Sequence, residues 1–238
     1  MSNSLPKTLI IVPAYNEEDS IASTLTTLMR IREKISTVDV CVINDGSKDR
    51  TVEIASQFDI VLLDLPQNLG IGGAVQTGYK YADKHGYDIA IQFDADGQHN
   101  ADDLRELIQP IINNEADMVI GSRFLEKTQY KGSSARRLGI YYFYLILKFL
   151  TGQRFTDPTS GFRAKNAKVI KLFAENYPKD YPEPEVLILL HKKGLRIKEI
   201  TAHMNARQGG VSSINSWKSI YYMAKVTLSI VMQKIIKE

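Results

Sequence analysis

The chain has 238 residues, of which 44% are hydrophobic and 24% charged, values ordinary for one globular domain. Its single cysteine excludes a disulfide framework and a cysteine-based zinc site. The net charge of +3 is unevenly distributed. Residues 1–120 hold 9 Lys and Arg against 19 Asp and Glu, a net −10, whereas residues 121–238 hold 21 against 8, a net +13. A basic half favours an anionic partner: nucleic acid, a phosphate group or a membrane surface.

No segment predicts export or a membrane span. The first residues lack the charged and then apolar pattern of a signal peptide, and no uncharged apolar run reaches about 20 residues. The two segments that come nearest, 138–150 and 217–236, are both interrupted by Lys.

Short apolar runs alternate with helical patterns over the first 120 residues. The runs predict strands buried on both faces, at 8–13, 38–43, 60–63, 88–93 and 117–121. Helices are expected between them, at 17–33, 49–58, 70–85 and 102–113. This alternation predicts βαβ units and a parallel sheet, whose ligands bind beyond the carboxyl ends of the strands.

The alternation fails after residue 121. The second half is expected to begin with a basic loop at 127–137, an apolar aromatic segment at 138–150 and a turn-rich segment at 156–163. A short helix at 186–193 and a candidate strand at 196–200 follow. A glycine loop at 207–213 and a segment of helical periodicity at 217–237 come last.

The most informative motif, DADGQH at 94–99, follows the fourth expected strand. Asp94 and Asp96 can share one hard divalent cation, with the amide oxygen of Gln98 as a third ligand. Mg²⁺ or Mn²⁺ bound in this way keeps positions open for substrate phosphates. The alternative is an acidic turn whose Asp caps a helix. The position at the ligand-binding edge of the sheet favours the metal site.

Other polar motifs fall at the same edge. PAYNE closes the first strand, NDGS the second and GSR the fifth. The glycine-rich stretch NLGIGGAVQTG lacks the ending of a P-loop, and Val75 occupies the third glycine position of the dinucleotide pattern. Its alternative interpretation is a loop entering a helix that packs closely on the sheet.

PAYNE, NDGS, NLGIGGA, DADGQH, GSR and DPTSGFR, in this order, resemble the inverting family-two glycosyltransferases. The resemblance spans residues 8–213 and is greatest to the polyisoprenyl-phosphate hexosyltransferases, typified by dolichyl-phosphate mannose synthase. It implies the GT-A fold, a Rossmann-like α/β nucleotide-sugar fold with a mostly parallel central sheet. Asn44 departs from the family pattern, in which many members have Asp.

The resemblance also implies residue roles. Asp94, Asp96 and Gln98 would hold Mg²⁺ or Mn²⁺, and Arg123 and Arg137 would bind the acceptor phosphate. Residues matching the nucleotide-sugar motifs would bind the donor: Pro13, Tyr15, Glu17, Asp45, Asp94, Asp157, Ser160, Arg163 and Arg207.

A lipid phosphate acceptor is already ionised near pH 7, so it needs positioning more than a dedicated base. Glu183 and Glu185 fall roughly where relatives acting on hydroxyls have their base. The candidate catalytic residues are Asp96, Arg123, Arg137 and Glu185. The alternative interpretation of Glu185 is a solvated acid near a helix start.

The segments 138–150 and 217–237 combine apolar, aromatic and Lys positions, which is typical of helices lying on an anionic membrane. The alternative is packing on the domain or on a dimer partner. We expect a GT-A domain over 1–213 and a C-terminal amphipathic, membrane-interfacial helix over 214–238.

The leading hypothesis is metal-dependent, inverting transfer of a hexose from UDP-glucose, UDP-N-acetylglucosamine or GDP-mannose to polyprenyl phosphate. The reaction would serve cell-envelope glycan or glycoprotein synthesis at the cytoplasmic membrane face, and a small membrane protein is a further candidate partner. The alternatives are transfer to a glycan hydroxyl, nucleic-acid binding by the basic half, and a non-catalytic nucleotide-sugar sensor. Because the aromatic residues gather in an apolar cluster at Tyr141–Tyr144, nucleic acid is not an expected partner.

Overall fold

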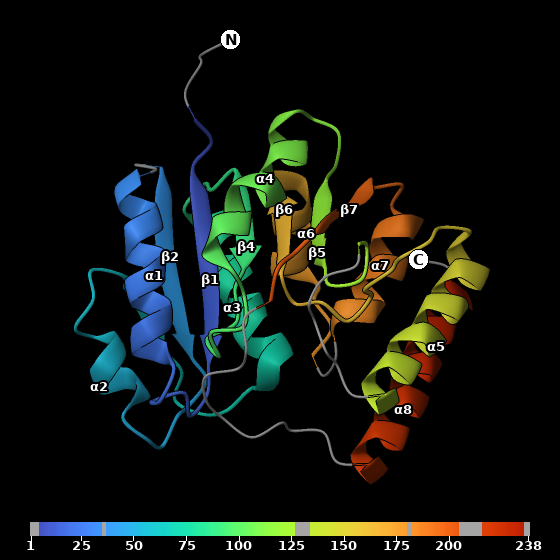
Figure 1. Cartoon of the computed structure of the whole chain (residues 1–238), viewed down its shortest axis with the longest axis horizontal. Coiled ribbons are helices and arrows are strands. Elements are labelled where there is room, and N and C mark those ends of the chain that lie inside the picture. Colours follow the sequence, from blue (N-terminus) through green and yellow to red (C-terminus); the bar gives the residue numbers. More distant parts are fainter. Residues whose placement is uncertain (1–4, 35–36, 127–133, 180–181, 205–215, 236–238) are drawn as a thin grey trace.

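The computed structural model describes residues 5–34, 37–126, 134–179, 182–204 and 216–235 (Figure 1). Its strands are β1 Thr8–Ala14, β2 Val38–Asn44, β3 Val61–Asp64, β4 Ile89–Gln92, β5 Met118–Ser122, β6 Arg163–Asn166 and β7 Ile197–Thr201. Its helices are α1 Ile21–Lys34, α2 Thr51–Ala55, α3 Gly70–Lys84, the 3₁₀ helix η1 Ala101–Asp103, α4 Leu104–Ile112, α5 Ser134–Thr151, α6 Ala167–Glu175, α7 Pro182–Lys192 and α8 Ser216–Ile235.

The strands form one sheet in the order β3-β2-β1-β4-β6-β5-β7. Among the described strands, β6 alone runs antiparallel to its neighbours, with Gln92 opposite Arg163 and Met118 opposite Lys165. The mostly parallel α/β sheet predicted from the sequence is therefore confirmed. The strands expected in the first 120 residues agree with β1 to β5 to within one residue at each end.

Strand β6 and helix α6 were not predicted. The sequence of β6, RAKN, has Arg163 and Lys165 on one face, and both side chains are almost completely buried. A central strand with two buried cations has no apolar pattern to reveal it, because such strands are normally near-continuous apolar runs.

Helix α1 begins four residues later than expected, because the PAYNE segment is held as a turn. Asn16 has a left-handed backbone with φ of 55°, and its side-chain oxygen accepts the N–H of Lys48 at 2.9 Å. The N–H of Glu17 donates to Oγ1 of Thr51 at 2.8 Å. These bonds join the ends of β1 and β2 and leave the side chains of the motif at the sheet edge.

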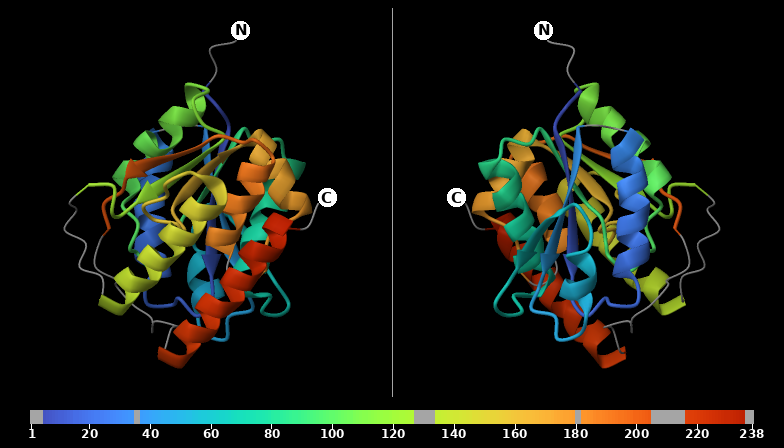
Figure 2. Two further views of the ribbon diagram at one scale, coloured as in Figure 1. Left: turned by 90° about the vertical axis from the view of Figure 1, so that its right-hand side faces the viewer. Right: turned by 90° about the vertical axis from the view of Figure 1, so that its left-hand side faces the viewer.

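A core lies on each face of the sheet. Helices α1 and α4 cover one face, with Leu25 and Leu107 fully buried. Helices α3, α6 and α7 cover the other (Figures 1 and 2), where Tyr79 and Phe173 are fully buried. Cys41 is buried in this second core.

Helix α3 packs closely on β1. A Cβ on Gly78 would lie 2.4 Å from Cγ2 of Ile11, so this position has no room for a side chain. The packing interpretation of the glycine-rich stretch is confirmed at this residue. At the other end of the stretch, Asn68, Gly70 and Ile71 line the cavity described below.

Helices α5 and α8 lie side by side on the outside of the second face (Figures 1 and 2). The hydroxyls of Tyr142 and Thr227 are 3.0 Å apart, and the side chains of Phe143 and Val226 are buried in the core. Helix α5 begins at Ser134, so residues 134–137, expected as loop, are helical. No helix of the described residues is long and apolar enough to cross a membrane.

Candidate active site

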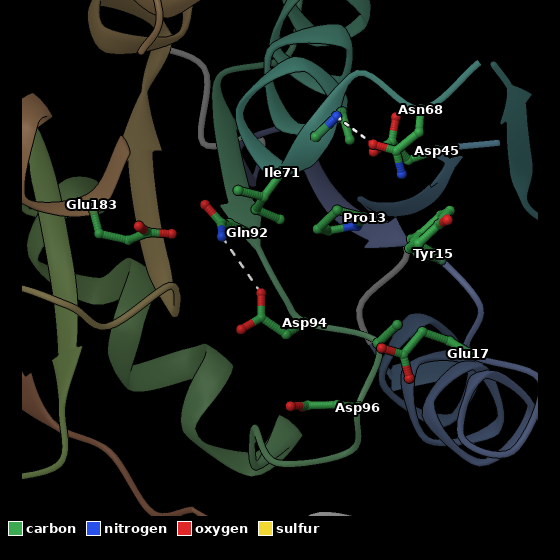
Figure 3. Close-up of a pocket in the computed structure, with 14 residues that line it drawn as sticks. Pro13, Tyr15, Glu17, Asp45, Asn68, Ile71, Gln92, Asp94, Asp96 and Glu183 are labelled. Carbon is green, nitrogen blue, oxygen red and sulfur yellow. Dashed lines mark hydrogen bonds between the residues drawn. The ribbon is translucent and has the colours of Figure 1, made fainter. Parts of the chain in front are cut away.

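A cavity of about 480 Å³ opens where β1, β2 and β4 end (Figure 3). Turns after these strands, the start of α3 and the start of α7 form its walls. The residues lining it are Pro13, Ala14, Tyr15, Glu17, Asp45, Asn68, Gly70, Ile71, Ala74, Gln92, Asp94, Ala95, Asp96 and Glu183. The structure thus brings together the predicted residues of the first, second and fourth strand ends.

The cavity is acidic. Five carboxylates line it, from Glu17, Asp45, Asp94, Asp96 and Glu183, and no Lys or Arg does so among its described lining residues. An anionic ligand would be repelled here unless a cation accompanied it. Four of the 19 acidic residues of the first half therefore line this one cavity.

One end of the cavity is formed by Pro13, Tyr15 and Asp45. The carboxylate of Asp45 is held by the backbone N–H of Leu69 at 2.7 Å. Next to it, Nδ2 of the buried Asn44 donates to the Asp64 carboxylate at 2.7 Å. Because an ionised Asp has no donor, this bond explains why an amide suits position 44 in this chain.

Asp94 and Asp96 line the middle of the cavity. The N–H of Gln98 donates to Oδ1 of Asp96 at 3.0 Å, while the Gln98 side chain is not among the lining groups. No cluster of three or more His, Cys, Asp or Glu that could hold a metal ion occurs in the described part of the chain. Two hard oxygen ligands on one wall fit Mg²⁺ or Mn²⁺, which take few protein ligands and complete their shell with water and phosphate oxygens.

Gln92 and Glu183 form the other end (Figure 3). Burial raises the pKa of the Glu183 carboxyl, and the charge of the nearby Arg163 opposes that rise. Sequence reasoning missed Gln92, which reads as one more residue of an apolar strand. It named Glu183 but chose Glu185, which does not line the cavity and accepts a 3.4 Å bond from Gln233 of α8.

Arg163 lies beneath this end and not in the cavity wall. Its guanidinium donates to the carbonyl oxygens of Pro158, Ser160 and Glu183 at 2.7 to 2.9 Å. The hydroxyl of Ser160 donates to the carbonyl of Gly121 at 2.7 Å. These residues of the DPTSGFR motif therefore fix the turn that backs the cavity.

Asp157 pairs with Arg123. Its two carboxylate oxygens accept hydrogen bonds from Nε and Nη2 of Arg123 at 2.6 and 2.7 Å. Its Oδ2 also accepts one from the backbone N–H of Arg123 at 3.1 Å. The carboxylate of Glu199 accepts the N–H groups of Thr156 and Asp157. Arg137 is exposed near the start of α5, and Arg207 lies outside the described residues.

Residues 9–174 match the family model described as glycosyl transferase family 2. The chain is 33% identical over 211 residues to the UDP-N-acetylglucosamine–dolichyl-phosphate N-acetylglucosaminyltransferase of Methanococcus voltae, which covers 80% of this chain and 82% of that protein. It is 30% identical over 171 residues to the undecaprenyl-phosphate mannosyltransferase of Micrococcus luteus, covering 69% and 68%.

Among solved structures, the glucosyl-3-phosphoglycerate synthase of Mycobacterium tuberculosis, in complex with Mg²⁺ and uridine diphosphate, has a TM-score of 0.75 at 18% identity. That likeness covers 98% of this chain and 81% of the synthase, and it concerns the fold. The family model spans more than half of the chain, and the acidic cavity lies where the family motifs converge. The chain therefore belongs to glycosyltransferase family 2 and has the GT-A fold.

Proposed function

We propose that this glycosyltransferase transfers a hexose from a nucleoside diphosphate sugar to polyprenyl phosphate, with inversion at the anomeric carbon. The observation that carries the proposal is the acidic cavity at the carboxyl ends of the strands, with Asp94 and Asp96 at its centre. The two relatives named above are polyprenyl-phosphate sugar transferases, one for N-acetylglucosamine and one for mannose. Glucose, N-acetylglucosamine and mannose all remain candidate sugars.

The layout of the cavity suggests how the donor binds. Tyr15 and Asp45 lie on one side of Asp94 and Asp96, and Glu183 lies on the other (Figure 3). We infer that the nucleoside contacts Pro13, Tyr15, Glu17 and Asp45. The hexose would then extend toward Gln92 and Glu183, whose oxygens can accept bonds from sugar hydroxyls. Arg163, Ser160 and Asp157 would act from behind by fixing the turn at 157–161.

The diphosphate would lie at Asp94 and Asp96. These two carboxylates would hold Mg²⁺ or Mn²⁺, with Gln98 as the further candidate ligand and Arg207 as the candidate arginine on the diphosphate. The ion, when bound, supplies positive charge that stabilises the leaving nucleoside diphosphate. In the transfer, an acceptor phosphate oxygen forms a bond to the anomeric carbon. The bond from that carbon to the donor phosphate breaks, and its electron pair leaves with the nucleoside diphosphate.

The acceptor phosphate carries its negative charge before it reacts, so no proton has to be removed. We propose that Arg137, which is exposed on α5, binds this phosphate together with Arg123. Arg137 and Arg123 differ in their surroundings. Arg123 already holds Asp157 with Nε and Nη2, so Arg137 would make the larger contribution.

The lipid acceptor also requires a membrane surface. An apolar stripe runs along the outward face of α5, where Leu138, Tyr141, Leu145 and Phe149 are exposed. Leu228 and Met232 of α8 are also exposed, and Lys148 flanks the α5 stripe. We propose that α5 and the C-terminal helix rest on the cytoplasmic face of an anionic bilayer without crossing it. Lys side chains beside an apolar helix face favour such a surface.

Transfer to a glycan hydroxyl is the second candidate, and the position of Glu183 favours it. A hydroxyl acceptor needs a base, and Glu183 lines the cavity at the end away from Tyr15, whereas Glu185 bonds to α8 (Figure 3). The purified chain should be given each of the three donors with Mn²⁺ and either vesicle-borne polyprenyl phosphate or an oligosaccharide. We expect sugar on the lipid alone. Sugar found on the oligosaccharide alone would replace the first proposal with the second.

A further inference from the structure

The carboxylate of Asp94 has close neighbours on Gln92, His99 and Gly161. Nε2 of Gln92 donates to its Oδ1 at 3.5 Å, and Nε2 of His99 lies 3.5 Å from its Oδ2. A Cβ on Gly161 would lie 3.1 and 3.2 Å from these two oxygens and 2.9 Å from Nε2 of Gln92. The Asp94 carboxylate is therefore flanked by the end of β4, by His99 of its own turn and by the backbone of the DPTSGFR turn, and it faces the cavity on its remaining side.

The hydrogen bonds fix which nitrogen of His99 faces the carboxylate as a donor. The backbone N–H of Asp94 donates to Nδ1 of His99 at 3.0 Å, so Nδ1 is an acceptor without a proton. The ring proton of the neutral imidazole is then on Nε2, which points at Oδ2 of Asp94. One histidine thus contacts both the backbone and the side chain of Asp94.

The His99 ring has little freedom to move. It is 5% exposed, its edge packs on Phe93 with centroids 5.2 Å apart, and Phe162 lies 4.8 Å away. The backbone of His99 also forms an isolated bridge with Met204. Gln92 is equally fixed, because it is 1% exposed within the sheet. Asp94 itself is less buried, with 37% of its side chain exposed toward the cavity.

We propose that Gln92 and His99 are positioning residues that orient the Asp94 carboxylate for the divalent ion. Gly161 leaves the room that this orientation needs. The proposal rests on the metal site of the proposed function and adds three residues to it. A ligand held by groups that are themselves packed requires less ordering when the ion binds, and loss of such supporting groups typically weakens metal binding 10-fold to 100-fold.

The test is Mn²⁺ binding, measured on the purified full chain by electron paramagnetic resonance of free Mn²⁺, with no donor present. His99→Phe keeps an aromatic ring between Phe93 and Phe162 but removes both nitrogens. Gln92→Leu removes the amide and leaves an apolar side chain that is branched and one bond shorter. We expect each to raise the Mn²⁺ dissociation constant by about 10-fold. His85→Phe, at the C-terminal end of α3, is the matched control and should bind Mn²⁺ like the wild type.

Gly161→Ala reaches the same carboxylate by a different route, because it crowds Asp94 and removes no donor. It should weaken Mn²⁺ binding as well, which keeps the proposal testable if His99→Phe does not fold. In turnover assays, raising the Mn²⁺ concentration should restore kcat in folded His99→Phe and Gly161→Ala, neither of which loses a proposed sugar contact. A purely structural defect would lower kcat at every Mn²⁺ concentration.

The outcomes separate this proposal from the metal site itself. If the wild type binds no Mn²⁺, or if Asp96→Ala binds it as well as the wild type does, the proposed metal site fails. If Asp96→Ala loses binding while His99→Phe, Gln92→Leu and Gly161→Ala all bind Mn²⁺ like the wild type, the metal site stands and the positioning role is refuted.

Discussion

Asp157→Ala should be among the most destabilising single substitutions in this chain. The Asp157 side chain is fully buried and that of Arg123 is 5% exposed, and they are joined by two bonds of 2.6 and 2.7 Å. Removing the carboxylate leaves a buried guanidinium without this counterion and takes away the acceptor of the Arg123 N–H. Breaking a buried pair in this way costs about 3–5 kcal/mol.

Thermal denaturation followed by circular dichroism measures the effect. For a chain of this length 1 kcal/mol lowers Tm by about 2–4 °C, so Asp157→Ala should lower Tm by roughly 6–20 °C. Glu53→Ala is the matched control. It breaks the ion pair between Arg50 and Glu53, whose side chains are 67% and 59% exposed, respectively. Its effect should be far smaller, since solvent screens exposed pairs.

The double variant Arg123→Met/Asp157→Leu adds a sharper test. Replacing both charges by apolar groups removes the unpaired ion, so the double variant should be more stable than Asp157→Ala alone. The reasoning is refuted if Asp157→Ala is no more harmful than Glu53→Ala. It is also refuted if the double variant loses the full sum of the two single losses.

Three further predictions concern other parts of the chain. Burial raises the pKa of the Cys41 thiol to about 12, so iodoacetamide at pH 8 should alkylate Cys41 only after unfolding, and mass spectrometry showing alkylation of the native chain would contradict this. The hydrogen bond to Asp103 raises the pKa of His203 above its usual value. The stabilisation that protonated His203 gives the folded chain is therefore complete below the unfolded-state pKa of about 6.5, and it is lost as the pH rises through the folded-state pKa. The Tm difference between wild type and His203→Gln should accordingly shrink with rising pH, and a constant or growing difference would rule out this linkage. In a thermal-shift panel of nucleotide sugars with Mn²⁺, the true donor at 100 times its Kd should stabilise the chain by about 2.7 kcal/mol. Asp96→Ala should lose that shift, and a shift that survives would count against the metal assignment.

The parts of the fold that depend on periodicity could be predicted from the sequence. Strands β1 to β5 are apolar runs, and their order along the chain already places DADGQH at the ligand-binding edge. Strand β6 could not be recognised, because Arg163 and Lys165 occupy its buried face. Their partners include nearby carbonyl oxygens of the chain and two groups that only tertiary packing brings close, the Glu183 carbonyl and the Tyr79 ring.

The site was predicted less completely than the fold. Residues two apart on a helix point in different directions, so only one of Glu183 and Glu185 can line the cavity, and the sequence does not say which. The pairing of Arg123 with Asp157 joins residues 34 positions apart. The sequence pattern does not single out Gln92, because its role depends on how the irregular turn after β4 places the Asp94 carboxylate.

The acceptor group that we propose for this glycosyltransferase is a lipid phosphate. The most direct measurement compares polyprenyl phosphate with the matching polyprenol in identical vesicles, using labelled nucleotide sugar and Mn²⁺, and counts label extracted with the lipid. We expect labelled lipid from the phosphate alone, and none when EDTA replaces Mn²⁺. Equal labelling of the polyprenol, or no labelled lipid from any of the three donors, would refute a lipid phosphate acceptor.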